Sequence, residues 1–254
     1  FENLPEITEI YEKITGMKVY ERQPYSGQLV FAAFSGSHQD AIAKGMKWRK
    51  EKNCQHWTVP YLPIDPEDVG RVYEADVIRI NSQSGKGGIG YILENQFGII
   101  MPPNMRETVG YLVKNVSDNA HRELMPSEVY NVFEKTFINK QSPVSLKEAH
   151  YVQKDGIEAD VTIEYNGEII NEKAHGNGRL NAVSVCMKKM LGIEYVLHTY
   201  TEHAMEEKAT SKAVSYVGIK DNNGKNFWGV GIATDIIDSS LKALVSAVNN
   251  MIED

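Results

Sequence analysis

A histidine at the mouth of a predicted helix is the first residue whose setting suggests chemistry. In "FAAFSGSHQDAIAKGM", the small residues Ser35, Gly36 and Ser37 precede His38, and a helical pattern follows. Imidazole exchanges a proton near neutral pH, so a histidine delivered on such a segment can act as an acid or a base. Tyr61 lies in "WTVPYLPIDP", in a loop that its prolines stiffen. The surrounding sequence offers no obvious nucleophile, carboxylate pair or metal cluster. We therefore expect the two side chains to serve a site that another domain completes.

Two glycine-rich stretches, "GNG" at 176–178 and "GVGIA" at 229–233, are predicted to lie where a strand passes into a helix. Neither completes the G-x-G-x-x-G pattern and neither lies in a βαβ unit, so a dinucleotide site is not supported. Two interpretations remain: a tight turn with close backbone packing, or an anion site formed by amide groups at a helix N-terminus. The second would suit the carboxylate of a small amino acid. Its apolar walls would be Leu180, Leu197, Tyr200, Ala204 and Ile232.

Other candidate sites are weaker. "NSQSGKGGIG" at 81–90 fails the phosphate-loop pattern at two positions, which leaves a hypothesis that Lys86 and the neighbouring amides face a substrate. His198 and His203 lie on one predicted strand. Regular alternation would place them on opposite faces, which argues against a metal pair. Because the sequence contains no His-x-His, Cys-x-x-Cys or HExxH, we expect no metal site complete within the chain.

The elements that must position these residues fall into three regions, which we predict as domains 1–25, 26–142 and 143–254. The first is a helix over about 5–15 with an extended link. This helix has an apolar stripe that needs a partner surface. The stripe and the absence of an initiator methionine together suggest that the chain is a piece of a longer protein. The stripe consists of Ile7, Ile10, Tyr11 and Ile14.

The second region is predicted to be mostly helices and loops. Helices are expected over 38–52, 105–116 and 127–137, with another opened by "GKGGIGYILEN". A short helix should begin at Pro66, with Asp65 as its N-cap.

The third region has a repeated order of elements. Three strand patterns precede a helix over 179–191, and three more precede a helix over 237–252. The predicted strands cover 144–152, 157–165, 168–175, 195–203, 210–220 and 226–234. We predict an α+β fold in which helical linker subdomains are followed by a tandem βββα domain with pseudo-twofold symmetry, because each half has one sheet face and one helix to cover it.

Composition narrows the class of protein. The 254 residues carry a net charge of −7 without a long basic block, which argues against nucleic-acid binding. No apolar run approaches the roughly 20 residues that a membrane span needs. The two cysteines, Cys54 and Cys186, are far apart and predict free thiols in a reducing, cytoplasmic compartment.

Longer motifs resemble one enzyme family. "PYSGQLVFAAFSGSHQDAIAKGM", "VPYLPIDPEDVGR" and "VIRINSQSGKGGIGYIL" resemble the segment after the barrel in 2-isopropylmalate synthases. "HGNGRLNAV", "TYTEHAM" and "WGVGIATDIIDSSLKALVSAVN" resemble the leucine-sensing C-terminal domain of that family, in its longer-chain branch. The resemblance runs in order over nearly the whole chain.

The resemblance implies an acyltransferase that condenses acetyl-CoA with 2-oxoisovalerate in leucine biosynthesis. In the family, a TIM barrel holds the divalent metal ion and the main catalytic base. This sequence contains at most the last barrel helix, so the chain alone is expected to be inactive. The matching linker residues, His38 and Tyr61, would enter the barrel of the partner subunit in a homodimer and help to polarise or deprotonate the acetyl methyl group.

The resemblance also implies feedback inhibition by leucine. The matching positions are Gly176, Gly178, Leu180, Leu197, Tyr200, Ala204 and Ile232. The sequence departs from the family pattern at Arg179, where proline is expected, and at Asn181, where a small apolar residue is expected. Three alternatives stay open: the same region of a citramalate synthase, a free-standing amino-acid-binding module, and a purely structural dimerisation domain.

Overall fold

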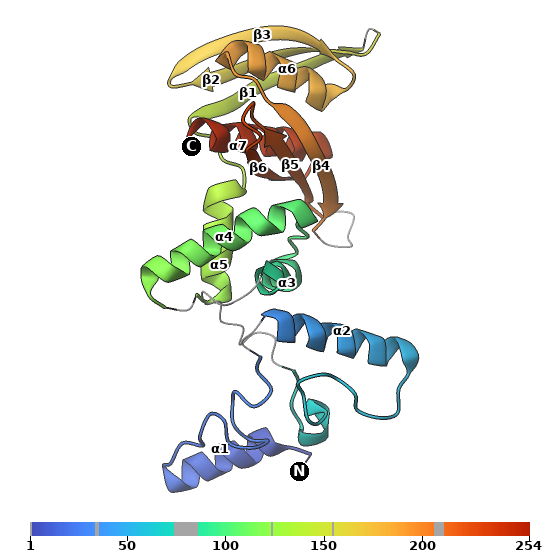
Figure 1. Ribbon diagram of the computed structural model, residues 1–254, viewed down its shortest axis with the longest axis vertical. Coiled ribbons are helices and arrows are strands. Elements are labelled where there is room, and N and C mark those ends of the chain that lie inside the picture. Colours follow the sequence, from blue (N-terminus) through green and yellow to red (C-terminus); the bar gives the residue numbers. More distant parts are fainter. Residues whose placement is uncertain (1, 34–35, 74–85, 123, 154, 206–210) are drawn as a thin grey trace. The chain divides into compact units, whose positions relative to one another are not determined.

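The computed structural model describes residues 2–33, 36–73, 86–122, 124–153, 155–205 and 211–254. The helices are α1 (Leu4–Thr15), α2 (Gly36–Lys52), η1 (Pro66–Val69, a 3-10 helix), α3 (Lys86–Phe97), α4 (Pro103–Ala120), α5 (Pro126–Phe137), α6 (Arg179–Leu191) and α7 (Ile236–Ile252). The strands are β1 (Val144–Gln153), β2 (Ile157–Tyr165), β3 (Glu168–Gly176), β4 (Val196–Ala204), β5 (Ala213–Lys220) and β6 (Asn226–Ala233). Figure 1 labels the α-helices and the strands, and the predicted α+β class is confirmed.

The chain divides into two compact units. The first comprises Phe1–Asn95 and Arg106–Val129, and the second comprises Gln96–Met105 and Tyr130–Asp254. The short segment Gln96–Met105, which runs from the end of α3 to the start of α4, therefore belongs with the C-terminal residues.

The first unit holds α1, α2 and η1 around a small apolar core. The core residues are Leu4, Phe31, Ile42, Val59, Leu62 and Val69. Asp65 caps η1 by accepting the amide proton of Glu67 at 3.1 Å, as predicted. The apolar stripe of α1 is exposed, with Ile14 at 79% of its full accessible area. Within the first unit nothing buries this stripe, as expected if another surface covers it.

The second unit contains the predicted tandem βββα repeat. Its sheets have the orders β1-β2-β3 and β4-β5-β6, and both are antiparallel. In Figure 1, α6 covers the first sheet and α7 covers the second. Helix α7 also contacts α6 and β1, so one core serves both halves. The core includes Val161, Val183, Val217 and Leu244.

The second glycine motif is not a strand-to-helix turn, which corrects the prediction. Gly229 and Gly231 lie inside β6, paired with Val217 and Ser215 of β5. A Cβ atom on Gly231 would lie 1.7 Å from the carbonyl oxygen of Ser239 in α7. These glycines let the α7 backbone approach the sheet closely, and their ladder pairing removes them from any anion site.

The prediction that the two strand histidines point to opposite faces is also wrong. The register of β4 shifts between Leu197 and Thr199, which marks a β-bulge at His198. An extra residue inverts the alternation of side chains beyond it. The His198 ring meets Trp228 edge-on at 5.5 Å between ring centroids, and the His203 ring stacks on Tyr216 at 5.7 Å. Both rings therefore lie on the sheet face that points away from α7.

Asparagine side chains join the end of α5 to the second half. Asn139 accepts the amide proton of Ile232 at 2.9 Å and donates to the Ile232 carbonyl oxygen at 3.1 Å, while its own amide donates to the carbonyl oxygen of Val230. Asn249 of α7 is fully buried and bonds both backbone groups of Val144, at 2.7 and 2.8 Å, and the carbonyl oxygen of Lys140. These bonds fix the chain where it enters β1.

Candidate functional site

His38 and Tyr61 are brought together by the fold. Their ring centroids lie 4.0 Å apart, and the ring planes make an angle of 24°. His38 is half-buried in the first turn of α2, whereas Tyr61 is 62% exposed on a loop. Stacking uses the ring faces, so the imidazole nitrogens and the phenol oxygen at the ring edges can point toward a third group. The two side chains that the sequence singled out together are thus in direct contact in the first unit.

A glycine in α2 makes this pairing possible. Gly45 follows His38 by two helical turns, so both lie on one face of α2. A Cβ atom at Gly45 would lie 2.7 Å from Cδ of Pro60 and 3.3 Å from Cγ1 of Val59. The loop can therefore lie directly on the helix there, which places Tyr61 over His38. Sequence reasoning missed Gly45, because only the fold shows which loop lies against it.

The loop that carries Tyr61 is fastened at both ends. The indole N–H of Trp57 donates to the carbonyl oxygen of Leu62 at 2.7 Å. Arg49 of α2 forms an ion pair with Asp65 at 3.2 Å and lies over the Trp57 ring. Tyr61 itself has φ 63°, a left-handed conformation that non-glycine residues seldom adopt. Strain of this kind persists where surrounding contacts enforce it, and it is common at functional sites.

Gln39, next to His38, holds the entry to α2. Its side chain is 1% exposed, and its Nε2 donates to the carbonyl oxygen of Ala33 at 2.5 Å. This bond ties the first turn of α2 to Ala33, and so it restrains the helix backbone next to His38. Sequence reasoning did not single out Gln39, because a glutamine beside a histidine carries no distinctive pattern.

The residues predicted to bind leucine lie in the second unit, at two places. Gly176 ends β3, Gly178 is the N-cap of α6, and Leu180 lies in the first turn of α6. Leu197, Tyr200 and Ala204 lie on β4 and share the sheet face that carries α7. Ile232 of β6 pairs with Val214 and lies on the opposite face, so the structure does not bring it together with the other three. Leu180 and Leu197 both pack against the shared core.

The two glycines of the first motif differ in their surroundings. A Cβ atom on Gly176 would lie 2.4 Å from the amide nitrogen of Ala182, so this residue packs the strand end onto α6. Around Gly178 a Cβ atom would meet nothing within 4 Å. Asn181 turns its Oδ1 back to accept the amide proton of Asn177 at 3.1 Å. The open approach to the amides of the first turn of α6 therefore lies at Gly178.

Tyr200 ends a chain of hydroxyl groups between β4 and α7. Its hydroxyl lies 2.7 Å from Oγ of Ser240 and also donates to the carboxylate of Glu202. Ser240 in turn donates to the carbonyl oxygen of Ile236 at 2.6 Å and lies 3.4 Å from the hydroxyl of Ser215. Burial raises the pKa of Tyr200, followed in effect by the hydrogen bond to Glu202. The phenol therefore keeps its proton, which it donates to Glu202.

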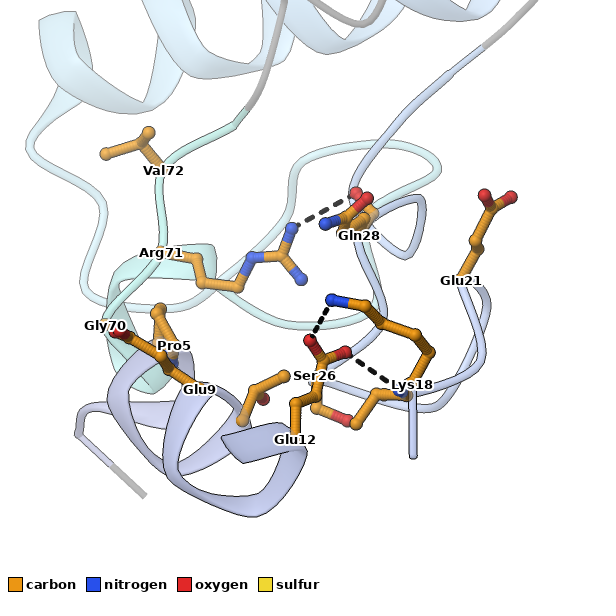
Figure 2. Close-up of a pocket in the computed structure, with 12 residues that line it drawn as sticks. Pro5, Glu9, Glu12, Lys18, Glu21, Ser26, Gln28, Gly70, Arg71 and Val72 are labelled. Atoms are coloured by element: carbon orange, nitrogen blue, oxygen red, sulfur yellow. Dashed lines mark hydrogen bonds and ion pairs between the residues drawn. The ribbon is translucent and has the colours of Figure 1, made fainter. Parts of the chain in front are cut away.

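A groove of about 670 Å³ lies in the first unit, between α1, the link after it and Arg71 (Figure 2). Its charges are largely satisfied within the unit. The carboxylate of Glu12 accepts hydrogen bonds from Lys18 at 2.7 Å and from the amide of Val19 at 2.9 Å. These two hydrogen bonds lower the pKa of Glu12. Arg71 donates to the carbonyl oxygens of Gly27 and other loop residues. None of the predicted site residues lines this groove.

Other candidate chemistry is limited within the described ranges. These residues contain no group of three or more His, Cys, Asp or Glu that could hold a metal ion. No helix among them is long and apolar enough to cross a membrane. Both cysteines are free, as predicted, and burial raises the pKa of Cys186 to about 11, which keeps that thiol protonated. The side chain of Lys86 lies outside the described part of the structure, as do residues 81–85.

Comparison with known proteins gives closely related sequences. Residues 28–94 match the model of the alpha-isopropylmalate synthase post-catalytic domain, and residues 123–252 match that of the LeuA allosteric (dimerisation) domain. A 2-isopropylmalate synthase of Desulfitobacterium hafniense is 54% identical over 100% of this chain and 46% of its own length. The enzyme of Helicobacter hepaticus is 50% identical over 99% of the chain and 47% of its own length. The enzyme of Clostridium acetobutylicum is 44% identical over 98% of this chain and 46% of its own length.

The chain spans about half the length of the curated relatives it matches. The allosteric-domain match covers about half of the chain and contains both βββα halves, while the post-catalytic match contains His38 and Tyr61. The chain therefore belongs to the family of the LeuA allosteric (dimerisation) domain, preceded by a region of the 2-isopropylmalate synthase post-catalytic type.

Proposed function

We propose that this chain is the post-catalytic and leucine-sensing part of a 2-isopropylmalate synthase that condenses acetyl-CoA with 2-oxoisovalerate. The stacked pair of His38 and Tyr61 is the observation that carries the proposal. A free-standing amino-acid-binding module would have no need of an imidazole and a phenol held together by a strained loop. The relatives, all named 2-isopropylmalate synthase, support the same assignment.

The proposed chemistry uses the edges of the two rings. His38 helps to polarise or deprotonate the acetyl methyl group, and Tyr61 assists through a hydrogen bond from its hydroxyl. The barrel of a partner subunit supplies the main base and the divalent metal ion. The enzyme is then a homodimer, which the name of the dimerisation domain supports, and it is proposed to be cytoplasmic, in keeping with its two free cysteines. This chain by itself is expected not to turn over.

The proposed effector is leucine. Its carboxylate would be bound by the backbone amides at the start of α6, where Gly178 leaves an open approach. Its aliphatic side chain would contact Leu180, Leu197, Tyr200 and Ala204, which leaves out Ile232 because that residue lies on the other face of the sheet. Leucine inhibits only to the extent that it binds one arrangement of the enzyme more tightly than the other.

The catalytic part is tested in the full-length enzyme with His38→Ala. We expect turnover to fall about 100-fold or more, as for loss of an acid–base group, with metal content and leucine affinity unchanged. His56→Ala is the matched control, because His56 is an exposed histidine of the same unit. Turnover within a few-fold of the parent enzyme would remove His38 from the chemistry.

A further inference from the structure

A segment from the linker region is attached to strand β4. The segment Gln96–Met105 precedes and enters α4, yet it belongs to the second unit. Phe97 stacks on Tyr130 with ring centroids 4.4 Å apart. At Gly98, which has φ +68°, a Cβ atom would lie 3.2 Å from the carbonyl oxygen of Met205, just after β4. The segment is therefore held close to the end of β4.

A hydrogen bond joins the same segment to β4 itself. The backbone amide of Ile100 donates to Nε2 of His203 at 3.3 Å. Because a backbone amide can only donate, Nε2 is the acceptor and the ring proton is on Nδ1. Nδ1 lies 3.0 Å from the carbonyl oxygen of Ala204, to which it donates. The hydroxyl of Tyr216 on β5 lies 3.0 Å from the same Nε2. One imidazole thus connects two strands and the linker segment.

Strand β4 carries the proposed leucine contacts on its other side. Tyr200 pairs with Val217, whose side chain is in the core with α7, and its hydroxyl bonds Ser240 of α7. Ala204 is four residues further along the strand and shares that face. His203 points to the opposite face, where its ring stacks on Tyr216. A shift of β4 caused by a ligand on one face must therefore displace the imidazole on the other.

We infer that His203 is a coupling residue, through which leucine bound on the α7 side of β4 changes the position of Ile100 and hence of the chain entering α4. The leucine half of this inference rests on the proposed function. Strand β4 connects the two sites, because Tyr200 on one face would contact the ligand and His203 on the other face bonds Ile100. The hydrogen bond to Ile100 gives the segment an attachment that a ligand can strengthen or release.

The hydrogen bond between Ile100 and His203 is tested first, without ligand, on the 254-residue chain. Amide hydrogen exchange at Ile100 is measured for the parent, His203→Leu, His203→Gln and His198→Leu. We expect His203→Leu to speed exchange at Ile100 about fivefold to tenfold, because the acceptor is lost. Glutamine keeps an acceptor and should restore much of the protection. His198→Leu is the matched control, since His198 lies on the same strand face but contacts Trp228.

The coupling is tested next in the full-length enzyme. We expect His203→Leu to bind leucine with an affinity within about threefold of the parent but to lose most of its inhibition, whereas His203→Gln and His198→Leu remain inhibited. Unchanged exchange at Ile100 in His203→Leu would overturn the attachment. Full inhibition of that variant would overturn the coupling.

The result for the parent separates this inference from the function on which it rests. A parent enzyme that neither binds leucine nor is inhibited by it would refute the leucine assignment, and the coupling with it. The exchange data would still decide whether His203 holds the segment. Melting curves for each variant show whether the second unit remains folded, and His203→Gln preserves the test if His203→Leu does not fold.

Discussion

At the scale of single residues, polar side chains hold backbone groups that no regular element satisfies. Asn249 pairs with the entry to β1 through three hydrogen bonds in a fully buried position. Glu128 does the same at the start of α5, where its carboxylate accepts the amide proton of Met125 at 2.9 Å. This is one half of a capping box, with the glutamate at the third helical position. Arg122 adds two hydrogen bonds to the same carboxylate.

The carboxyl group of Glu128 should titrate far below its ordinary range. The hydrogen bonds from Arg122, and then that from Met125, lower its pKa from 4.5 to about 2. A lowered folded-state pKa means that the stabilising contribution is fully present above pH 4.5 and is lost as the pH falls through about 2. Carboxyl carbon shifts followed by NMR check the midpoint. In Arg122→Ala the midpoint should rise toward 4.5, and a parent midpoint already near 4.5 would contradict the assignment.

At the scale of elements, local signals predicted the strands and helices well. Helix α6 was predicted over its observed range from its apolar periodicity, and the structure shows glycines at both ends, Gly178 as N-cap and Gly192 in a left-handed conformation. Helix α4 runs beyond its predicted range at both ends, because flanking polar residues continue it. The bulge at His198 could not be predicted, since one extra residue in a strand leaves no mark in the sequence.

The role of the glycines in β6 was also beyond local sequence. Gly231 and Ser239 are separated by a turn and the start of a helix, and only the packed fold shows that their backbones touch. The same limit applies to Gly45, whose importance comes from a loop that folds back onto α2. By contrast, the pairing of His38 with Tyr61 was expected from the motif context and is seen in the structure.

The contact between β6 and α7 leads to a stability prediction. In Gly231→Ala the new Cβ would meet backbone atoms of α7 at 1.7 and 2.6 Å, so the helix must move off the sheet. We expect a loss of about 3 kcal/mol or more in the free energy of unfolding. Gly178→Ala is the control, because its Cβ would meet nothing within 4 Å and its φ of −161° suits any residue.

Urea unfolding followed by the fluorescence of Trp228, with Trp48 and Trp57 replaced by phenylalanine, measures both variants. Trp228 is 1% exposed and lies on β6, so its emission reports the second unit. Equal midpoints for the two alanine variants would show that α7 does not pack on β6 as closely as described.

At the scale of the whole molecule, the two units carry different parts of the proposed function. The first holds the proposed catalytic pair, and the second holds all of the residues proposed to bind leucine. Each unit has its own apolar core. Leucine binding should therefore not require the barrel.

Isothermal titration of this chain with leucine tests that expectation. We expect saturable heat below millimolar ligand, and weaker binding in Tyr200→Ala, which loses the hydroxyl bond to Ser240 and apolar contact area. Isoleucine as a second titrant distinguishes the citramalate synthase alternative. No heat with either amino acid at millimolar concentration would leave a structural dimerisation domain.

The fit of Asn139 against β6 has a consequence for assembly. Its side-chain amide occupies the donor and the acceptor of Ile232, and its backbone N–H occupies the carbonyl of Val230. The hydrogen-bonding groups on this edge of β6 are thus already occupied by Asn139. An invading strand from another molecule would have to displace it before it could add to the sheet, so this side of the domain is guarded against amyloid-like stacking.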